Sequence, residues 1–129
     1  MSSDAIPDDD VLLEQGPVRR KTGAPTTKLT IRLYRSRGYS CDVAEHYNAY
    51  AGVRNDLFRF TDVVAVNGKE ILFVQTTSKS NMSSRRKKIA GIEEARLIAL
   101  TPCARVIILG WYKDGPRWNY KEEEYRPNE

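Results

Sequence analysis

Histidine and cysteine are both scarce in this sequence. It has one histidine, His46, and two cysteines, Cys41 and Cys103, which lie far apart and form no CxxC pair. A structural zinc site needs a fuller set of such ligands, and a lone histidine disfavours a catalytic triad. In a reducing compartment we expect both cysteines to be free, buried thiols that form no disulfide.

Long apolar runs and several familiar motifs are also missing. No apolar run approaches the roughly 20 residues of a membrane-spanning helix, and the acidic start, MSSDAIPDDD, lacks the basic-then-apolar pattern of a signal peptide. We therefore expect a cytoplasmic protein without a membrane partner. The absence of GxxxxGKS/T, GxGxxG and GxSxG argues against a P-loop, a dinucleotide-binding fold and an α/β-hydrolase.

The charge that is present is unevenly distributed. The net charge is +4, but residues 1–15 carry five acids and no base, so residues 16–129 carry +9. Five bases fall within ten residues that contain no acid: Lys79, Arg85, Arg86, Lys87 and Lys88. A basic body with such a cluster attracts phosphate polyanions. The alternative is that this run is a solvated helix face.

The hydrophobic pattern predicts a single α/β domain over residues 26–129, preceded by an acidic arm over 1–25. A helix is expected over 27–38, with Gly38 as its terminating residue, and strands over 39–47, 61–66 and 71–77. A second helix over 83–100, bent or divided at Gly91, leads to a buried strand over 104–112 and a more exposed last strand. This α-β-β-β-α-β order predicts a mixed sheet flanked by helices.

The clearest local pattern is a β-hairpin that turns at Asn67-Gly68, a dipeptide that favours tight turns. Strand residues alternate between faces, so Asp62 at the start of one strand should meet Gln75 and Thr77 near the end of the other. Oxygen ligands of this kind suit Mg²⁺, which can activate water for attack on a phosphodiester. The alternative is that they are ordinary polar residues at a solvated strand end.

The segment TDVVAV-NG-KEILFVQTTS resembles the signature of the PD-(D/E)XK nucleases, an aspartate that opens one strand and a (D/E)-x-K on the next. The element order over roughly residues 26–112 also matches the core of that family. The resemblance implies a restriction-endonuclease-like fold, with Mg²⁺ or Mn²⁺ held by Asp62, Gln75 and the Thr76 carbonyl. In the resemblance, Thr77 stands where the (D/E)-x-K signature has its lysine. The wider string from RNDLFRFTD to KI is also similar to uncharacterised phage and bacterial nuclease-like proteins.

Two positions depart from that signature. Gln75 offers an oxygen without a charge, so the site should hold Mg²⁺ more weakly, and Thr77 cannot position water as a cation does. Lys79, or a helix base such as Arg85 or Lys88, is the candidate replacement for the lysine. The first helix lacks the glutamate that many family members carry, so Glu45 or Asp56 would assist the metal. The alternative is that both acids are surface or salt-bridged residues.

Two functions follow. The first is a metal-dependent DNA nuclease of a bacterial or phage-infected cell, in which six bases grip the backbone: Arg54, Lys79, Arg85, Arg86, Lys87 and Lys88. The second is a nuclease-like fold without catalysis that binds nucleic acid or a protein, as a phage accessory protein or inhibitor would. Many related nucleases are homodimers, but no pattern in this sequence defines an interface.

Overall fold

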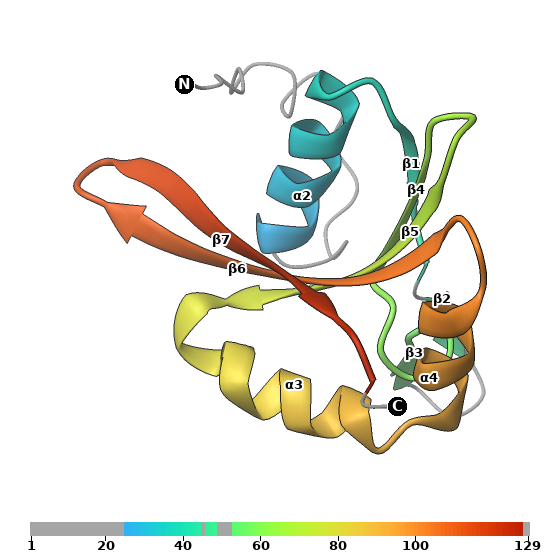
Figure 1. Ribbon diagram of the computed structural model, residues 1–129. Coiled ribbons are helices and arrows are strands. Elements are labelled where there is room, and N and C mark those ends of the chain that lie inside the picture. The colour runs from blue at the N-terminus through green and yellow to red at the C-terminus, as the bar shows by residue number, and fades with distance from the viewer. Residues whose placement is uncertain (1–24, 45, 49–52, 128–129) are drawn as a thin grey trace.

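The structure, a computed structural model, describes residues 25–44, 46–48 and 53–127. A five-stranded sheet with the order β1-β4-β5-β6-β7 lies between one helix and a pair of helices (Figure 1). The elements in chain order are α2 (Pro25–Ser36), β1 (Ser40–Val43), β2 (His46–Asn48), β3 (Val53–Asn55), β4 (Val63–Val66), β5 (Ile71–Ser78), η1 (Lys79–Asn81), α3 (Met82–Ala90), α4 (Glu93–Leu100), β6 (Ala104–Asp114) and β7 (Arg117–Tyr125). β2 and β3 pair with each other in a separate two-stranded sheet.

Helix α2 begins two residues earlier than predicted, and Gly38 terminates it as expected. Pro25 is its first residue, where a missing N–H costs nothing, and Gly38 follows its end with φ of 95°. The N–H of Gly38 donates to the Arg35 carbonyl and that of Tyr39 to the Tyr34 carbonyl, both at 3.0 Å. This Schellman arrangement sets the Tyr39 ring edge-on to the Tyr34 ring, 5.6 Å between centroids. The cap thereby directs the chain from α2 into β1.

The sheet is mixed, as expected. β4 is antiparallel to β1 and to β5, β5 is parallel to β6, and β7 is antiparallel to β6. The parallel pair is joined by η1, α3 and α4, which together form the crossover. The β4–β5 connection is longer than the expected two-residue turn. It spans residues 67–70, and the Asn67 side chain accepts hydrogen bonds from the N–H groups of Lys69 and Glu70.

Three expectations were wrong in detail. The first strand ends at Val43, and residues 46–48 belong to the separate small sheet. Residues 53–55, where no strand was expected, form β3. The division of the second helix at Gly91 is confirmed, and the extended backbone of Ile92 begins α4 anew. Cys103 is exposed and has a φ of 70°, since it lies in the tight connection before β6.

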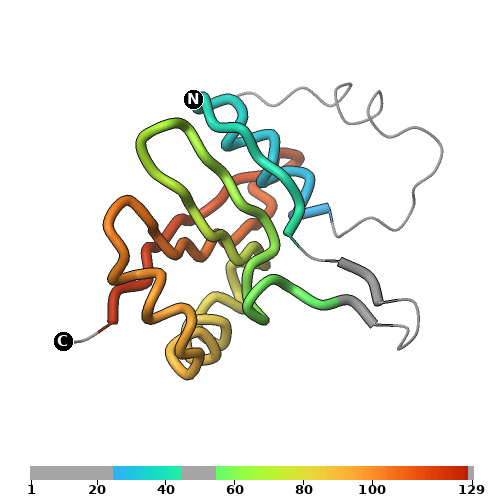
Figure 2. Tube along the Cα trace, turned by 90° about the vertical axis from the view of Figure 1, so that its right-hand side faces the viewer, coloured from blue at the N-terminus to red at the C-terminus, as the bar shows by residue number. Residues whose placement is uncertain are grey.

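Each face of the sheet has its own hydrophobic core, and Figure 2 shows the helices on opposite sides. On the α2 side, buried residues include Tyr34, Val74 and Trp111. On the α3–α4 side they include Phe60 and Ile89. None of the described helices is long and apolar enough to cross a membrane.

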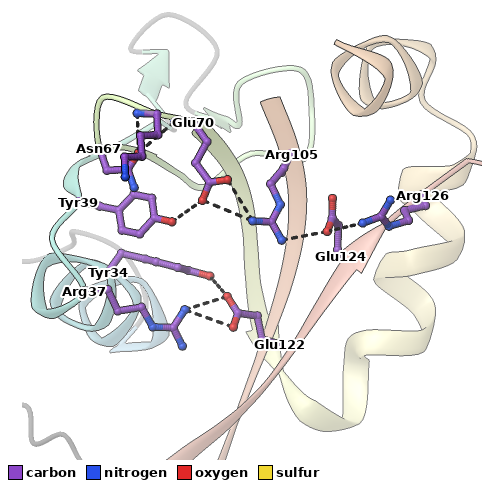
Figure 3. A network of polar contacts seen from close by, with 10 residues as sticks. Tyr34, Arg37, Tyr39, Asn67, Glu70, Arg105, Glu122, Glu124 and Arg126 are labelled. Carbon is purple, nitrogen blue, oxygen red and sulfur yellow. Dashed lines mark hydrogen bonds and ion pairs between the residues drawn. The ribbon is translucent and has the colours of Figure 1, made fainter. Parts of the chain in front are cut away.

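A group of alternating acids, bases and tyrosines, here called the clasp, joins α2 and β1 to the last two strands (Figure 3). Tyr34 donates to Glu122 at 2.6 Å, and Arg37 pairs with the same carboxylate at 3.1 Å. Glu70 accepts from Tyr39 and pairs with Arg105, which also pairs with Glu124. A cavity of about 290 Å³ lies among these residues. Glu70 and Arg105 lie where β5 begins and Glu122 lies level with Thr76, so the clasp runs along the α2 face of the sheet from the start of β5.

Candidate active site

Asp62 and Gln75 meet across the β4–β5 pair, as the sequence predicts. Gln75 Nε2 donates to Asp62 Oδ2 at 2.9 Å, and the Thr76 N–H donates to the same oxygen at 2.9 Å. Asp62 is 9% exposed and Gln75 is 3% exposed. The backbone of Asp62 is also held on both sides, by its N–H to the Val74 carbonyl and by the Ala44 N–H to its own carbonyl. The carboxylate is therefore placed by the sheet itself.

Alternation along β5 divides its polar residues between the two faces. Thr76 faces α2, where its hydroxyl accepts a hydrogen bond from Thr30 at 2.9 Å, and Thr30 in turn accepts one from Trp111 Nε1 at 2.9 Å. Gln75 and Thr77 consequently face α3. The N–H and C=O of one strand residue point to the same neighbour, so the Thr76 carbonyl lies on the Asp62 side. It is suitably directed for the ligand role that the resemblance implies.

Asp56 is brought back to Asp62 by a compact turn. The N–H of Arg59 donates to the Asp56 carbonyl and that of Thr61 to the Leu57 carbonyl, at 2.8 and 2.9 Å. Phe58 and Arg59 adopt positive φ values of 55° and 69°, and the fully buried Phe60 anchors the turn. The second carboxylate of the site is thus Asp56, one of the two acids that the sequence offered.

Burial raises the pKa of Asp62 from its ordinary value of 3.8 to about 7. The Thr76 N–H opposes this rise, because a hydrogen bond to the carboxylate favours its charged form, and Gln75 does the same. The charge of Asp56 raises the pKa further, as does a hydrogen bond between the two side chains. A buried carboxyl group whose pKa is strongly raised beside a second carboxylate is typical of functional centres.

The oxygen atoms of this site fit a hard divalent cation. Gln75 Oε1 is buried and has no hydrogen-bond partner, an arrangement that normally costs free energy. The amide now presents its nitrogen to Asp62, so Oε1 would join the carboxylates of Asp62 and Asp56 and the Thr76 carbonyl only after the amide turns over, and these four would then be the kind of oxygens that Mg²⁺ and Mn²⁺ prefer. Within the described part of the chain, no group of three or more His, Cys, Asp or Glu side chains could hold a metal ion.

Lys79, one candidate replacement for the signature lysine, lies against an aromatic ring. Its ammonium lies 4.4 Å from the centroid of the Tyr112 ring, on β6, two strands from β4. Thr77 is 6% exposed and neutral. Arg85 lies three residues after the buried Met82 and four before the buried Ile89, on the stripe of α3 that faces the sheet. Its Nε is buried without a hydrogen-bond partner.

The other basic residues of α3 lie on its outer surface. Arg86 pairs with Glu123 of β7 at 2.6 Å, and Lys87 and Lys88 are exposed. Glu45 lies outside the described residues, and so does the side chain of Arg54. The structure therefore separates the predicted bases into Arg85 on the inner stripe, Lys79 over Tyr112 and an exposed outer group.

The sequence reasoning missed the hydroxyl of Thr61, beside Asp62. Thr61 is fully buried, and its Oγ1 has no hydrogen-bond partner. Adjacency to Asp62 was the only available signal, because a threonine at the start of a strand is common.

Compared with protein-family models, with curated proteins and with solved structures, the chain gives no match.

Proposed function

We propose that the protein is a metal-dependent DNA nuclease of the PD-(D/E)XK type, with a variant active site. The observation that carries the proposal is the Asp62–Gln75 pair, in which a buried carboxylate accepts a hydrogen bond from the Gln75 amide nitrogen while the oxygen of the same amide is buried and lacks a partner. The order of α2, β1, β4, β5, the α3–α4 crossover and β6 supports it, since this is the α-β-β-β-α-β core that the resemblance implies.

In this proposal Asp62, Asp56, Gln75 Oε1 and the Thr76 carbonyl hold Mg²⁺ or Mn²⁺. The bound cation supplies an activated water and stabilises charge on the phosphodiester. Arg85 supplies the positive charge of the missing lysine but not its acid–base role. A guanidinium binds phosphate oxygens well but does not give up a proton at neutral pH. Lys87 and Lys88 contact the nucleic-acid backbone from the outer face of α3, which positions the substrate without reading its sequence.

The test is cleavage of labelled single-stranded, duplex and branched DNA with Mg²⁺ or Mn²⁺. Asp62→Asn keeps the size of the side chain and removes its charge, so cleavage should fall by about a hundred-fold or more. Asp42→Asn is the matched control, since Asp42 is an exposed aspartate of the neighbouring strand β1 and should leave cleavage unchanged. Cleavage that persists in Asp62→Asn contradicts the proposed site.

A second candidate function is nucleic-acid binding without cleavage. The neutral Thr77 at the lysine position favours it, together with the commitment of Lys79 to Tyr112. The same experiment separates the two candidates. DNA binding without cleavage in the presence of either metal supports the binding function and removes the nuclease.

A further inference from the structure

The β6–β7 hairpin extends beyond the rest of the sheet. β5 ends at Ser78, which pairs with Trp111, but β6 and β7 continue through Tyr112–Asn119, Lys113–Trp118 and Asp114–Arg117. Gly115, with φ of 64°, and Pro116 close the hairpin in two residues, the short connection that matches strand twist. In Figure 1 this end of the hairpin projects past both α2 and α3.

The projecting end leaves the sheet from the same side as the candidate active site. Gln75, Thr76 and Thr77 lie near the end of β5, and β6 runs parallel to β5. The hairpin therefore continues outward from the edge where Asp62 and Gln75 meet. A nucleic acid bound at that edge would pass beside it.

The side chains of this end suit a nucleic acid. Trp118 is 41% exposed, and the Lys113 ammonium lies 4.9 Å from the centroid of its ring. Arg117 at the turn is exposed, and Asp114 is the one acid between Tyr112 and Lys121. Within the described part of the chain, no ion pair engages Lys79, Lys113 or Arg117.

We infer that the β6–β7 hairpin binds unpaired nucleotides, with Trp118 as a stacking surface and Lys113 and Arg117 as phosphate contacts. An exposed aromatic ring flanked by cations is the arrangement by which proteins bind single strands, since a base can stack on the ring and the backbone can follow the charge. A cross-strand Trp118–Lys113 pair also stabilises a hairpin, but that role does not explain why part of the Trp118 ring is exposed to solvent. The inference rests on the proposed function only in that the ligand is a nucleic acid.

The experiment measures affinity by fluorescence anisotropy for three labelled probes without metal: oligothymidylate, a duplex of equal length and a fork with two unpaired arms. Trp118→Ala should weaken binding of the single strand and the fork by about five-fold or more, and change duplex binding little. Trp118→Phe should retain most of the affinity, because phenylalanine also stacks. Leu100→Ala is the control, since Leu100 is an exposed apolar residue just before the connection to β6, at the other end of the sheet.

A second readout separates stacking from a structural role of Trp118. Stacking on a base quenches tryptophan fluorescence, so oligothymidylate should quench the wild-type protein and not Trp118→Phe, in which the buried Trp111 is the remaining indole. Unchanged affinity of Trp118→Ala for all three probes overturns the hairpin inference and leaves the nuclease proposal standing. A wild-type protein that binds none of the probes overturns the hairpin inference, and the cleavage experiment with Mg²⁺ or Mn²⁺ then decides the nuclease proposal by itself.

Discussion

At the scale of single residues, Asp62 combines two opposing demands. Burial and the Asp56 charge favour its protonated form, whereas the Thr76 N–H and Gln75 favour the carboxylate. The result is a pKa of about 7 in the folded protein, against 3.8 in an exposed chain. Active sites commonly retain such a destabilising group because function needs it.

The first prediction concerns Asp62 and pH. Between pH 3.8 and about 7 the folded state keeps a proton that the unfolded chain releases, so the free energy of unfolding falls as pH rises through this range. Asp62→Asn removes this loss. We expect it to be more stable than the wild type at pH 8 by about 1–4 kcal/mol, with the difference shrinking towards pH 4. Urea denaturation at both pH values measures it, and a difference that grows on acidification contradicts the assigned pKa.

The second prediction concerns the hydroxyl of Thr30, which is fully buried between Thr76 and Trp111. Thr30→Val keeps the shape of the side chain but leaves the Trp111 N–H and the Thr76 hydroxyl without this partner. We expect a loss of about 1–3 kcal/mol in the free energy of unfolding. Thr30→Ser, which retains the hydroxyl, is the control and should lose less. Equal losses in both variants would assign the effect to packing.

At the scale of elements, the position of α3 depends on the absence of one side chain. A Cβ at Gly110 of β6 would lie 2.4 Å from Met82 Sδ and 2.9 Å from the Lys79 Cα. Gly110 therefore lets η1 and the first turn of α3 lie directly on β6. This contact orients the stripe of α3 that carries Arg85, and it also sets Lys79 near Tyr112.

The third prediction follows from that contact. Gly110→Ala should displace the start of α3 and destabilise the protein by about 1–3 kcal/mol, as overpacking does. Nuclease or binding activity should fall together with stability, because Arg85 moves with the helix. Gly91→Ala is the control, since its Cβ would lie 3.6 Å from the Lys88 carbonyl oxygen, an ordinary contact. Thermal unfolding of the two variants, measured side by side, provides the comparison.

Sequence patterns predicted the elements with strong periodicity and missed those set by distant contacts. Strand alternation and the β4–β5 hairpin correctly predicted that Asp62 contacts Gln75. The position of Gly38 correctly predicted where α2 ends. The approach of Asp56 depends on positive φ values at Phe58 and Arg59, which no local pattern marks. The contact of Lys79 with Tyr112 depends on the pairing of β5 with β6, two strands that lie far apart in the sequence.

At the scale of the whole molecule, the two ends of the sheet have different characters. The clasp extends along the α2 face from the end where β5 begins, and its charges are largely paired with one another. A hydrogen bond from Tyr39, followed by Arg105, lowers the pKa of Glu70, so this carboxylate stabilises the fold above its ordinary pKa and the contribution is lost on acidification. The other end carries buried polar atoms without partners and exposed cations, which suits it for ligands.

The fourth prediction concerns the salt dependence of DNA binding. Each phosphate contact that is removed should reduce the slope of log affinity against log salt concentration by about 1. We expect this change for Lys88→Gln, on the exposed face of α3. Lys69→Gln, in the loop between β4 and β5 at the clasp end, should leave the slope unchanged. Equal slopes for the wild type and Lys88→Gln would remove α3 from the binding surface.

The alternation of β5 also limits how this protein can change by insertion or deletion. Gln75 serves the candidate site on one face, while Thr76 holds α2 on the other. A single residue gained or lost within β5 would exchange these two roles and damage both faces at once. Insertions and deletions are tolerated better in a loop, where side chains do not alternate between the two faces of the sheet, as in the connection over residues 67–70. Among descendants of this sequence, variation in length should therefore accumulate there and spare Ile71–Ser78.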